Sequence, residues 1–382
     1  MVAPVDEQAS GEEGALFSQV ADLLRANRTG ARAELRERLI RARSDLEHFF
    51  AQHPYSVTCL RLLAECAQQL DDLPQAQQYI ERAELLDPWN IEILIITESL
   101  HEAEADTLRR ANPRTTPLLA KIYSGVANAD QLIELALGAF QLGQLERAYS
   151  LAKLAYLINP QNSHHLLDVW SVGAIFDPAR TYAELRLLDR QSEPNAYLFL
   201  VLGSVCHVLH QYDEALEWIE KGMLLSPDNP YVSAMLNNEM AYVFVRKGQH
   251  LDRAISLART ALEQFPDEKA NGFIRDTLGV AYLKKGQLDK AIQNLREAVR
   301  KDPCVVPRFH LTVALLESHD AAAALQELKV LFAARSSLDT PHAEECAILE
   351  RVQSNANQIE ARLTSGGAEN IQPVLQLLRE LL

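Results

Sequence analysis

Apolar residues recur at helical spacing along both ends of the chain. Near the N-terminus a single stripe is formed by Leu35, Leu39, Ala42, Leu46 and Phe49. A second stripe ends the chain and consists of Ile371, Val374, Leu375, Leu378, Leu381 and Leu382. Steps of three and four residues place such side chains on one face of an α helix. Both ends are therefore predicted to be helices that bury one face.

Between these ends, small residues and prolines recur with a fixed internal spacing. Residues 272–305 show it most clearly, with Gly279, Ala291 and Ala298 followed by Pro303. Small residues at these places let two antiparallel helices pack closely, and proline ends the second helix. Gly286 suits the turn between the two helices. The same spacing of two small residues and a proline occurs upstream at Ala76, Ala83 and Pro88, at Ala148, Ala155 and Pro160, at Ala215, Gly222 and Pro227, and at Ala254, Ala261 and Pro266.

This pattern, with Leu278-Gly279, Tyr282 and Ala291 in sequence, resembles the tetratricopeptide repeat. The resemblance implies an all-α fold, a tetratricopeptide-type superhelix built as a solenoid of antiparallel helix pairs. We expect a disordered N-terminus over 1–13, divergent helical repeats over 14–125, the main array over 126–341 and capping helices over 342–382. One residue more separates Gly248 from Ala254 than Gly286 from Ala291, so that turn should be longer.

Two stretches fit the repeat poorly. Residues 89–121 contain Asn112-Pro113 and Thr116-Pro117 and are expected to form a distorted helix pair, with a bend as one outcome. Residues 164–191 keep a helical pattern without the signature. The last helix, after Thr364-Ser365-Gly366-Gly367, has two readings: a cap over the final repeat, or a detachable helix that docks on its own or another chain and can join two copies.

The resemblance also implies a concave surface lined by the first helix of each pair, on which peptide or helix segments of other proteins bind. The inward positions that match are Tyr197, Leu200, Ser204, Asn238, Tyr242, Arg246, Phe273, Asp276, Val280, Lys284 and Phe309. Each aromatic residue at such a place either anchors a partner or packs against the next repeat. A chaperone-type carboxylate clamp is not expected, because Asp276 occupies a place where the clamp would not tolerate an acid.

Composition narrows the function further. The net charge of −15 and the pI near 5.2 oppose binding to nucleic acid and to anionic membranes. The 5 cysteines are scattered and lack metal-binding or redox spacing, which favours a reducing compartment. The longest apolar stretch, residues 196–209, is too short to cross a bilayer, and the acidic start does not resemble a secretion signal. A cytoplasmic location without direct membrane insertion is predicted.

No motif for catalysis, metal binding or cofactor binding is found. Phosphate-binding glycine loops, paired zinc ligands and nucleophile elbows are missing from the sequence. His164 and His165 are adjacent, so their side chains diverge on a helix, and His310 has no recognisable partner in the pattern. We therefore predict a non-enzymatic scaffold or adaptor without cofactors. The alternative is a peptide-sensing regulator whose superhelix changes shape when the ligand binds.

Overall fold

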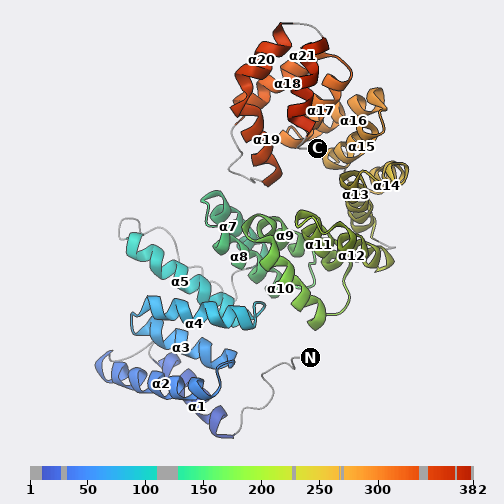
Figure 1. The fold of residues 1–382 in the computed structure, drawn as a ribbon. Helices are drawn as coiled ribbons and strands as arrows, with labels where there is room; N and C mark the ends of the chain where they lie inside the picture. Colours follow the sequence, from blue (N-terminus) through green and yellow to red (C-terminus); the bar gives the residue numbers. More distant parts are fainter. Residues whose placement is uncertain are drawn as a thin grey trace. The chain divides into compact units, whose positions relative to one another are not determined.

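The computed structural model describes residues 11–26, 32–109, 128–225, 229–265, 267, 271–334, 343–365 and 368–379. Over these residues all regular secondary structure is helical, without strands (Figure 1). The expected all-α class is confirmed. The chain divides into two compact units, Met1–Val169 (unit 1) and Trp170–Leu382 (unit 2), and helix α9 contains the division.

Unit 1 begins with a helix pair that covers the first regular repeat. Its helices are α1 (Gly11–Ala26), α2 (Arg32–Gln52), α3 (Val57–Gln69), α4 (Leu73–Leu86), α5 (Ile91–Arg109), α7 (Ala129–Gln141), α8 (Leu145–Ile158) and the start of α9 (His165–Phe176). On α2 the predicted stripe is turned inward, with Leu39, Ala42 and Leu46 buried and Phe49 half-buried; the Leu35 side chain lies outside the described residues. Helix α1 starts at Gly11, ahead of the predicted residue 14.

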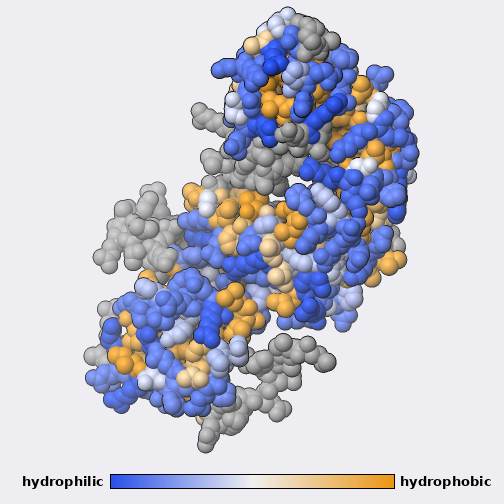
Figure 2. Space-filling view, in the orientation of Figure 1, coloured by the Kyte–Doolittle hydropathy of each residue, from blue (hydrophilic) through white to orange (hydrophobic). Residues whose placement is uncertain are grey.

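Unit 2 is a succession of helix pairs followed by three further helices. It contains α10 (Pro178–Gln191), α11 (Ala196–Val208), α12 (Tyr212–Leu225), α13 (Pro230–Lys247), α14 (Leu251–Gln264), α15 (Gly272–Lys284), α16 (Leu288–Lys301), α17 (Val305–Glu317), α18 (Ala321–Ala333), α19 (Ala343–Ser354), α20 (Ala356–Thr364) and α21 (Ala368–Arg379). Hydrophilic residues cover most of the face seen in Figure 2. The predicted boundaries at 125/126 and 341/342 fall outside the described residues and stay predictions.

The small residues of the sequence pattern lie at helix contacts. A Cβ added to Gly279 would come within 2.5 Å of Leu295 Cγ on α16. Helices α15 and α16 can therefore pack this closely because Gly279 has no side chain. All the paired alanines of the five units are fully buried, and Gly222 is buried. Helix α16 ends at Lys301, just ahead of Pro303. The sequence marks therefore correspond to helix contacts and helix ends, as predicted.

The turn between the two helices of a pair needs one residue in the left-handed conformation. Gly143, Gly248 and Gly286 have φ of 75°, 63° and 71°. Residues without this freedom fill the same place elsewhere, namely Asp71, His210 and His319. The longer turn predicted after Gly248 is confirmed, because its extra residue adds a second left-handed position at His250 (φ 50°). Turn geometry, rather than glycine itself, is what the repeat preserves.

A buried cation joins the helices that precede and follow the irregular part of unit 1. Helix α8 packs directly against α5. The fully buried Lys153 on α8 reaches Glu84 Oε1 on α4 at 3.3 Å and donates to the Pro88 carbonyl at 3.1 Å. Residues 110–127 lie outside the described part of the chain, so the distorted pair and bend predicted for 89–121 are not observed directly.

The C-terminal stripe is buried on α21, where Ile371, Val374, Leu375 and Leu378 all face the interior of unit 2. Leu381, Leu382 and the glycines of the predicted joint lie outside the described residues. Among the helices described, none is both long and apolar enough to cross a lipid bilayer.

Candidate functional site

The first helices of the pairs in unit 2 pack side by side. Helix α11 contacts α13, α13 contacts α15, and α15 contacts α17. The second helices α12, α14, α16 and α18 make at most sparse contacts with one another over the described residues. The first helices therefore form the tighter layer of unit 2. We call the eleven predicted partner-binding positions on this layer the first-helix surface.

Five members of the first-helix surface keep part of their side chains accessible. They are Tyr197, Tyr242, Arg246, Phe273 and Lys284. These residues combine flat aromatic rings with two cations, the residue types that contribute most often to protein contacts. They lie on α11, α13 and α15.

The other six members are buried. They are Leu200, Ser204, Asn238, Asp276, Val280 and Phe309. Phe309 is fully enclosed on α17, so its ring packs inside the unit and does not face solvent. The Asn238 Oδ1 atom is also buried and accepts no hydrogen bond from any described residue. These side chains form the floor beneath the accessible five.

A histidine that the sequence analysis did not select supports Tyr242. His207 on α11 lies with its ring centroid 4.6 Å from that of Tyr242, and its Nδ1 is 3.1 Å from Glu239 Oε1 on α13. The ring contact and the polar contact both join α11 to α13. Tyr242 thus packs against a neighbouring repeat and is half-buried, while its role as an anchor for a partner stays a prediction.

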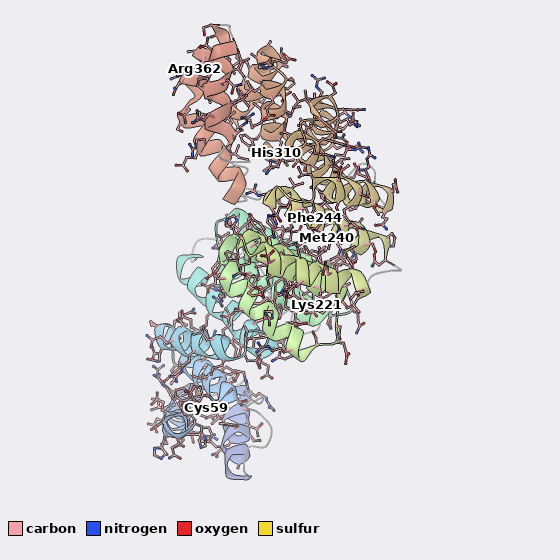
Figure 3. The ribbon with its side chains drawn as sticks, turned by 45° about the vertical axis from the view of Figure 1, so that its right-hand side comes forward. Cys59, Lys221, Met240, Phe244, His310 and Arg362 are labelled. Atoms are coloured by element: carbon pink, nitrogen blue, oxygen red, sulfur yellow. The ribbon has the colours of Figure 1, made fainter. Side chains whose placement is uncertain are left out.

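A second polar pair joins α15 to α17. His310 Nδ1 is 2.9 Å from both carboxylate oxygens of Asp276, and both residues are buried (Figure 3 labels His310). His310, for which the sequence pattern indicated no partner, is therefore paired with a residue of the preceding repeat. Asp276 uses its carboxylate inside the layer, because a buried charge needs a hydrogen-bonded partner.

Two cations lie near each other on the first-helix surface. The pKa of Lys284 is lowered, first by burial and then by the positive charge of Arg246. Both residues lie in the last turn of their helices, where a cation interacts favourably with the helix dipole. Burial also raises the pKa of Tyr197, at the other end of the surface.

The aromatic residue of α15 belongs partly to the core. The Phe273 ring lies edge-on to Phe265, with centroids 5.4 Å apart, and Phe265 in turn contacts Tyr231. This aromatic chain links α13, the end of α14 and α15. Phe273 keeps an accessible edge while its position is fixed from behind.

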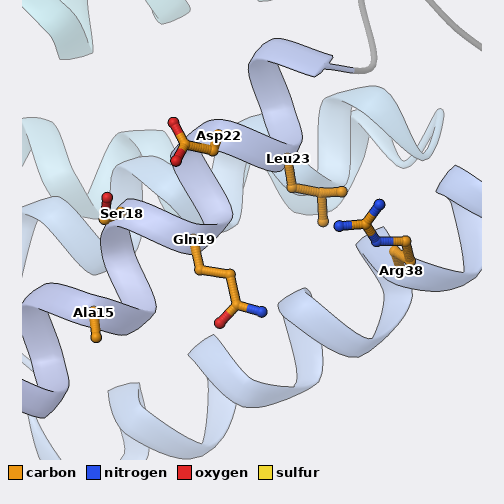
Figure 4. A pocket seen from close by; sticks show the side chains of 6 residues that line it. All are labelled: Ala15, Ser18, Gln19, Asp22, Leu23 and Arg38. Carbon is orange, nitrogen blue, oxygen red and sulfur yellow. The ribbon is translucent and has the colours of Figure 1, made fainter.

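Metal-binding groups and cavities are the remaining features of the described residues. Nowhere among them do three His, Cys, Asp or Glu side chains gather as metal ligands would. His165 Nδ1 lies 3.3 Å from Asp168 Oδ2, so this histidine has a structural partner. A hollow of about 580 Å³ lies between α1 and α2 of unit 1 (Figure 4). Its lining is formed by Ala15, Ser18, Gln19, Asp22, Leu23 and Arg38.

Comparison with known families agrees with the repeat geometry. Residues 275–303, which span most of α15 and α16, match the family model described as tetratricopeptide repeat. The chain therefore contains a tetratricopeptide repeat. A curated relative, BBSome complex member BBS4 of Bos taurus, is 24% identical over 194 residues, which are 50% of this chain and 35% of the relative. The tetratricopeptide-repeat chain thus matches only about a third of that relative's length.

Solved structures with similar helical architecture include the human IFIT1 dimer, with a TM-score of 0.48, 16% identity and coverage of 83% of this chain and 75% of that one. The Cut9–Hcn1 hetero-tetramer of the APC/C gives a TM-score of 0.46 and 17% identity, covering 90% and 64%. TTC0263, a tetratricopeptide protein of Thermus thermophilus, gives 0.40 and 20%, covering 49% and 99%. With TM-scores below 0.5, these likenesses say nothing about the partners of this chain.

The tetratricopeptide repeat supports a scaffold for protein–protein interaction, since proteins of this family are generally non-enzymatic. Within it, the polar pairs missed by the sequence analysis follow the repeat. Asp276 and His310 lie 34 residues apart, and His207 and Glu239 lie 32 apart, each close to one period. A search for opposite charges one period apart on first helices is the signal that could have found them.

Proposed function

We propose that this tetratricopeptide-repeat protein is an adaptor that binds peptide or helix segments of partner proteins on the first-helix surface of unit 2. The observation that carries the proposal is the half-buried state of Tyr197, Tyr242 and Phe273. The rings of Tyr242 and Phe273 are also held by contacts with His207 and Phe265. A rigid aromatic ring loses little conformational entropy when a partner covers it. Arg246 and Lys284 add charge that favours partners with acidic side chains beside the apolar ones.

The proposed contact area is narrower than the set predicted from the sequence. The buried residues of the first-helix surface act as its floor, and Phe309 belongs to the core of the α17 repeat. Free thiols at Cys59, Cys66 and Cys206, all buried, suit the reducing cytoplasm in which we place the protein.

Site-specific photo-crosslinking tests the proposal directly. A photoreactive amino acid at position 242 should crosslink to a partner in the native cell, while the same group at Tyr55 should not. Tyr55 is the control because it is an exposed tyrosine of unit 1, far from the first-helix surface in sequence. Recovery of the same partners from both positions, or of none from position 242, would contradict the proposal.

Alanine substitution measures the contribution of the anchors. Tyr242→Ala together with Phe273→Ala should weaken the captured partner's affinity by about tenfold or more, the usual effect of removing central aromatic contacts. The matched control is Arg296→Ala, an exposed change on the second helix α16. Far-UV circular dichroism of each variant separates lost binding from lost folding.

The second candidate is a regulator in which ligand binding changes the shape of the array. It is favoured by the polar pairs that join successive first helices, since a ligand that moves one helix would strain them. Small-angle scattering with and without the captured peptide distinguishes the two. A regulator becomes more compact on binding, whereas an adaptor with a preformed surface keeps its radius of gyration.

A further inference from the structure

The C-terminal helix α21 lies against a first helix of the array. It contacts α17 and α20, and its contacts with the second helix α18 are at most sparse over the described residues. Figure 1 shows α21 beside α17. Four buried residues, Ile371, Val374, Leu375 and Leu378, form its inner stripe at positions i, i+3, i+4 and i+7. Such a stripe is the usual contact face of an amphipathic helix held on a protein surface.

The stripe continues into an ion pair with α17. Arg379 donates from Nε and Nη2 to Glu317 Oε1 at 3.1 and 3.0 Å. Glu317 holds on α17 the place that Lys284 holds on α15 and Arg246 on α13. Each lies in the last turn of a first helix, two residues before the left-handed residue of the inter-helix turn. Arg379 therefore contacts a position that belongs to the first-helix surface in the two preceding repeats.

The role of a plain end cap is already filled by another helix. Helix α19 contacts both α17 and α18, as α17 itself contacts both α15 and α16. It thus covers the end of the array in the manner of a following first helix. Helix α20 adds contacts to α18. What α21 covers in addition is the first-helix side of α17.

We propose that α21 occupies the end of the partner-binding layer, and that its seat on α17 accepts an amphipathic helix of a partner with the same pattern. That pattern is an apolar stripe at i, i+3, i+4 and i+7 with a cation at i+8. This inference rests on the proposed function and extends it to α17, where the chain's own helix mimics the partner. The acidic Glu317, in place of the cations of α13 and α15, gives this end of the layer its preference for a basic helix.

Two properties of α21 suit a replaceable segment. It has 12 residues, a length at which an isolated helix is marginal in water, and Pro373 inside it removes one backbone donor. Its stability therefore comes from the seat on α17 and α20. A partner helix that makes more apolar contact than α21 can replace it on this seat. It must compete with α21, which is tethered and therefore present at a high effective concentration.

The experiment uses the full-length chain and a fluorescein-labelled peptide of residues 366–382 as the probe. Wild-type chain should bind the peptide weakly, because α21 holds the seat. Leu378→Asp places a carboxylate at a fully buried position of the stripe and should strengthen peptide binding by about tenfold or more. Gln376→Asp makes the same kind of change on the exposed side of α21 and should leave binding as in the wild type.

A charge exchange locates the bound peptide and avoids the buried core. The chain with Glu317→Arg should prefer the peptide carrying Arg379→Glu, and the chain with Arg379→Glu should prefer the unaltered peptide. We expect each preference to be about fivefold, as suits a partly exposed ion pair. Equal affinity for both peptides in both chains would overturn the proposal.

Two further results would also overturn it. If hydrogen exchange shows α21 released in Leu378→Asp but no peptide binds, the seat on α17 does not accept a separate helix. If sedimentation shows a dimer that depends on Arg379 of one copy and Glu317 of another, the seat on α17 joins two copies of the chain and does not receive a partner. Crosslinking at position 242 reports on α13 independently, so failure of the proposed function and failure of this inference are distinguishable.

Discussion

Two substitutions in the inter-helix turns of unit 2 should change its stability in opposite directions. Gly286 and His319 hold the same place in successive repeats, with φ of 71° and 63°. The backbone after each makes the same hydrogen bond, from Gln287 N to Tyr282 O and from Asp320 N to Leu315 O, both at 2.9 Å. Gly286→Ala should destabilise unit 2, whereas His319→Gly should stabilise it.

The magnitude follows from the backbone alone. A Cβ at Gly286 would meet no described atom within 4 Å, so steric crowding does not contribute. The left-handed conformation costs a non-glycine residue about 1–2 kcal/mol, and the greater freedom of glycine in the unfolded chain offsets about 0.5–1 kcal/mol of this. Gly286→Ala should therefore lose about 1 kcal/mol. The exposed His319, replaced by glycine, should gain about 0.5–1 kcal/mol.

Urea unfolding followed by far-UV circular dichroism measures both changes as shifts of the midpoint at constant slope. Hydrogen exchange of the Gln287 and Asp320 amides reports on each turn separately, which matters because an array can unfold in parts. If both substitutions shifted the midpoint in the same direction, the turn conformation would not be the cause, and the equivalence of the two turns would be refuted.

Three other predictions concern packing and charge. Gly279→Ala should lower the stability of unit 2 by about 1–2 kcal/mol in urea unfolding, because overpacking against α16 exceeds the gain in helix propensity; an unchanged midpoint would contradict the close approach. Lys153→Met should cost unit 1 about 3–5 kcal/mol, because it removes the cation that faces the buried carboxyl group of Glu84, and a thermal melt like that of the wild type would refute this. Arg246→Gln should raise the pKa of Lys284, measured by NMR of its side-chain nitrogen. Because folding lowers that pKa, the unfolded chain binds more protons near it, so stability should rise with pH between the folded and unfolded pKa values in the wild type and less so in the variant.

Part of the candidate site could be predicted from the sequence because the positions of the small residues fix the register of each repeat. Once Gly279 and Ala291 fix where α15 meets α16, helical spacing decides which side chains of α15 face the neighbouring first helices. The same reasoning cannot tell a half-buried Phe273 from a fully buried Phe309. That difference depends on how closely the next elements pack.

The turns show a similar division. Glycine revealed the turn at residue 286, but the histidine at 319 gave no sign of its left-handed conformation, because the surrounding hydrogen bonds impose that conformation whatever the residue. The extra residue between Gly248 and Ala254 could be read from spacing, since helix contacts fix both ends of the turn.

The sequence by itself determined that the chain forms antiparallel helix pairs, that the helices of a pair meet at alanine and glycine, and that the second helix ends near a proline. These features follow from local steric effects. Only the tertiary structure decided that Lys153 pairs with Glu84, that His310 pairs with Asp276, and that α21 lies on α17. Buried charges and docked helices depend on surfaces brought together from distant parts of the chain, and local pattern does not encode which surfaces meet.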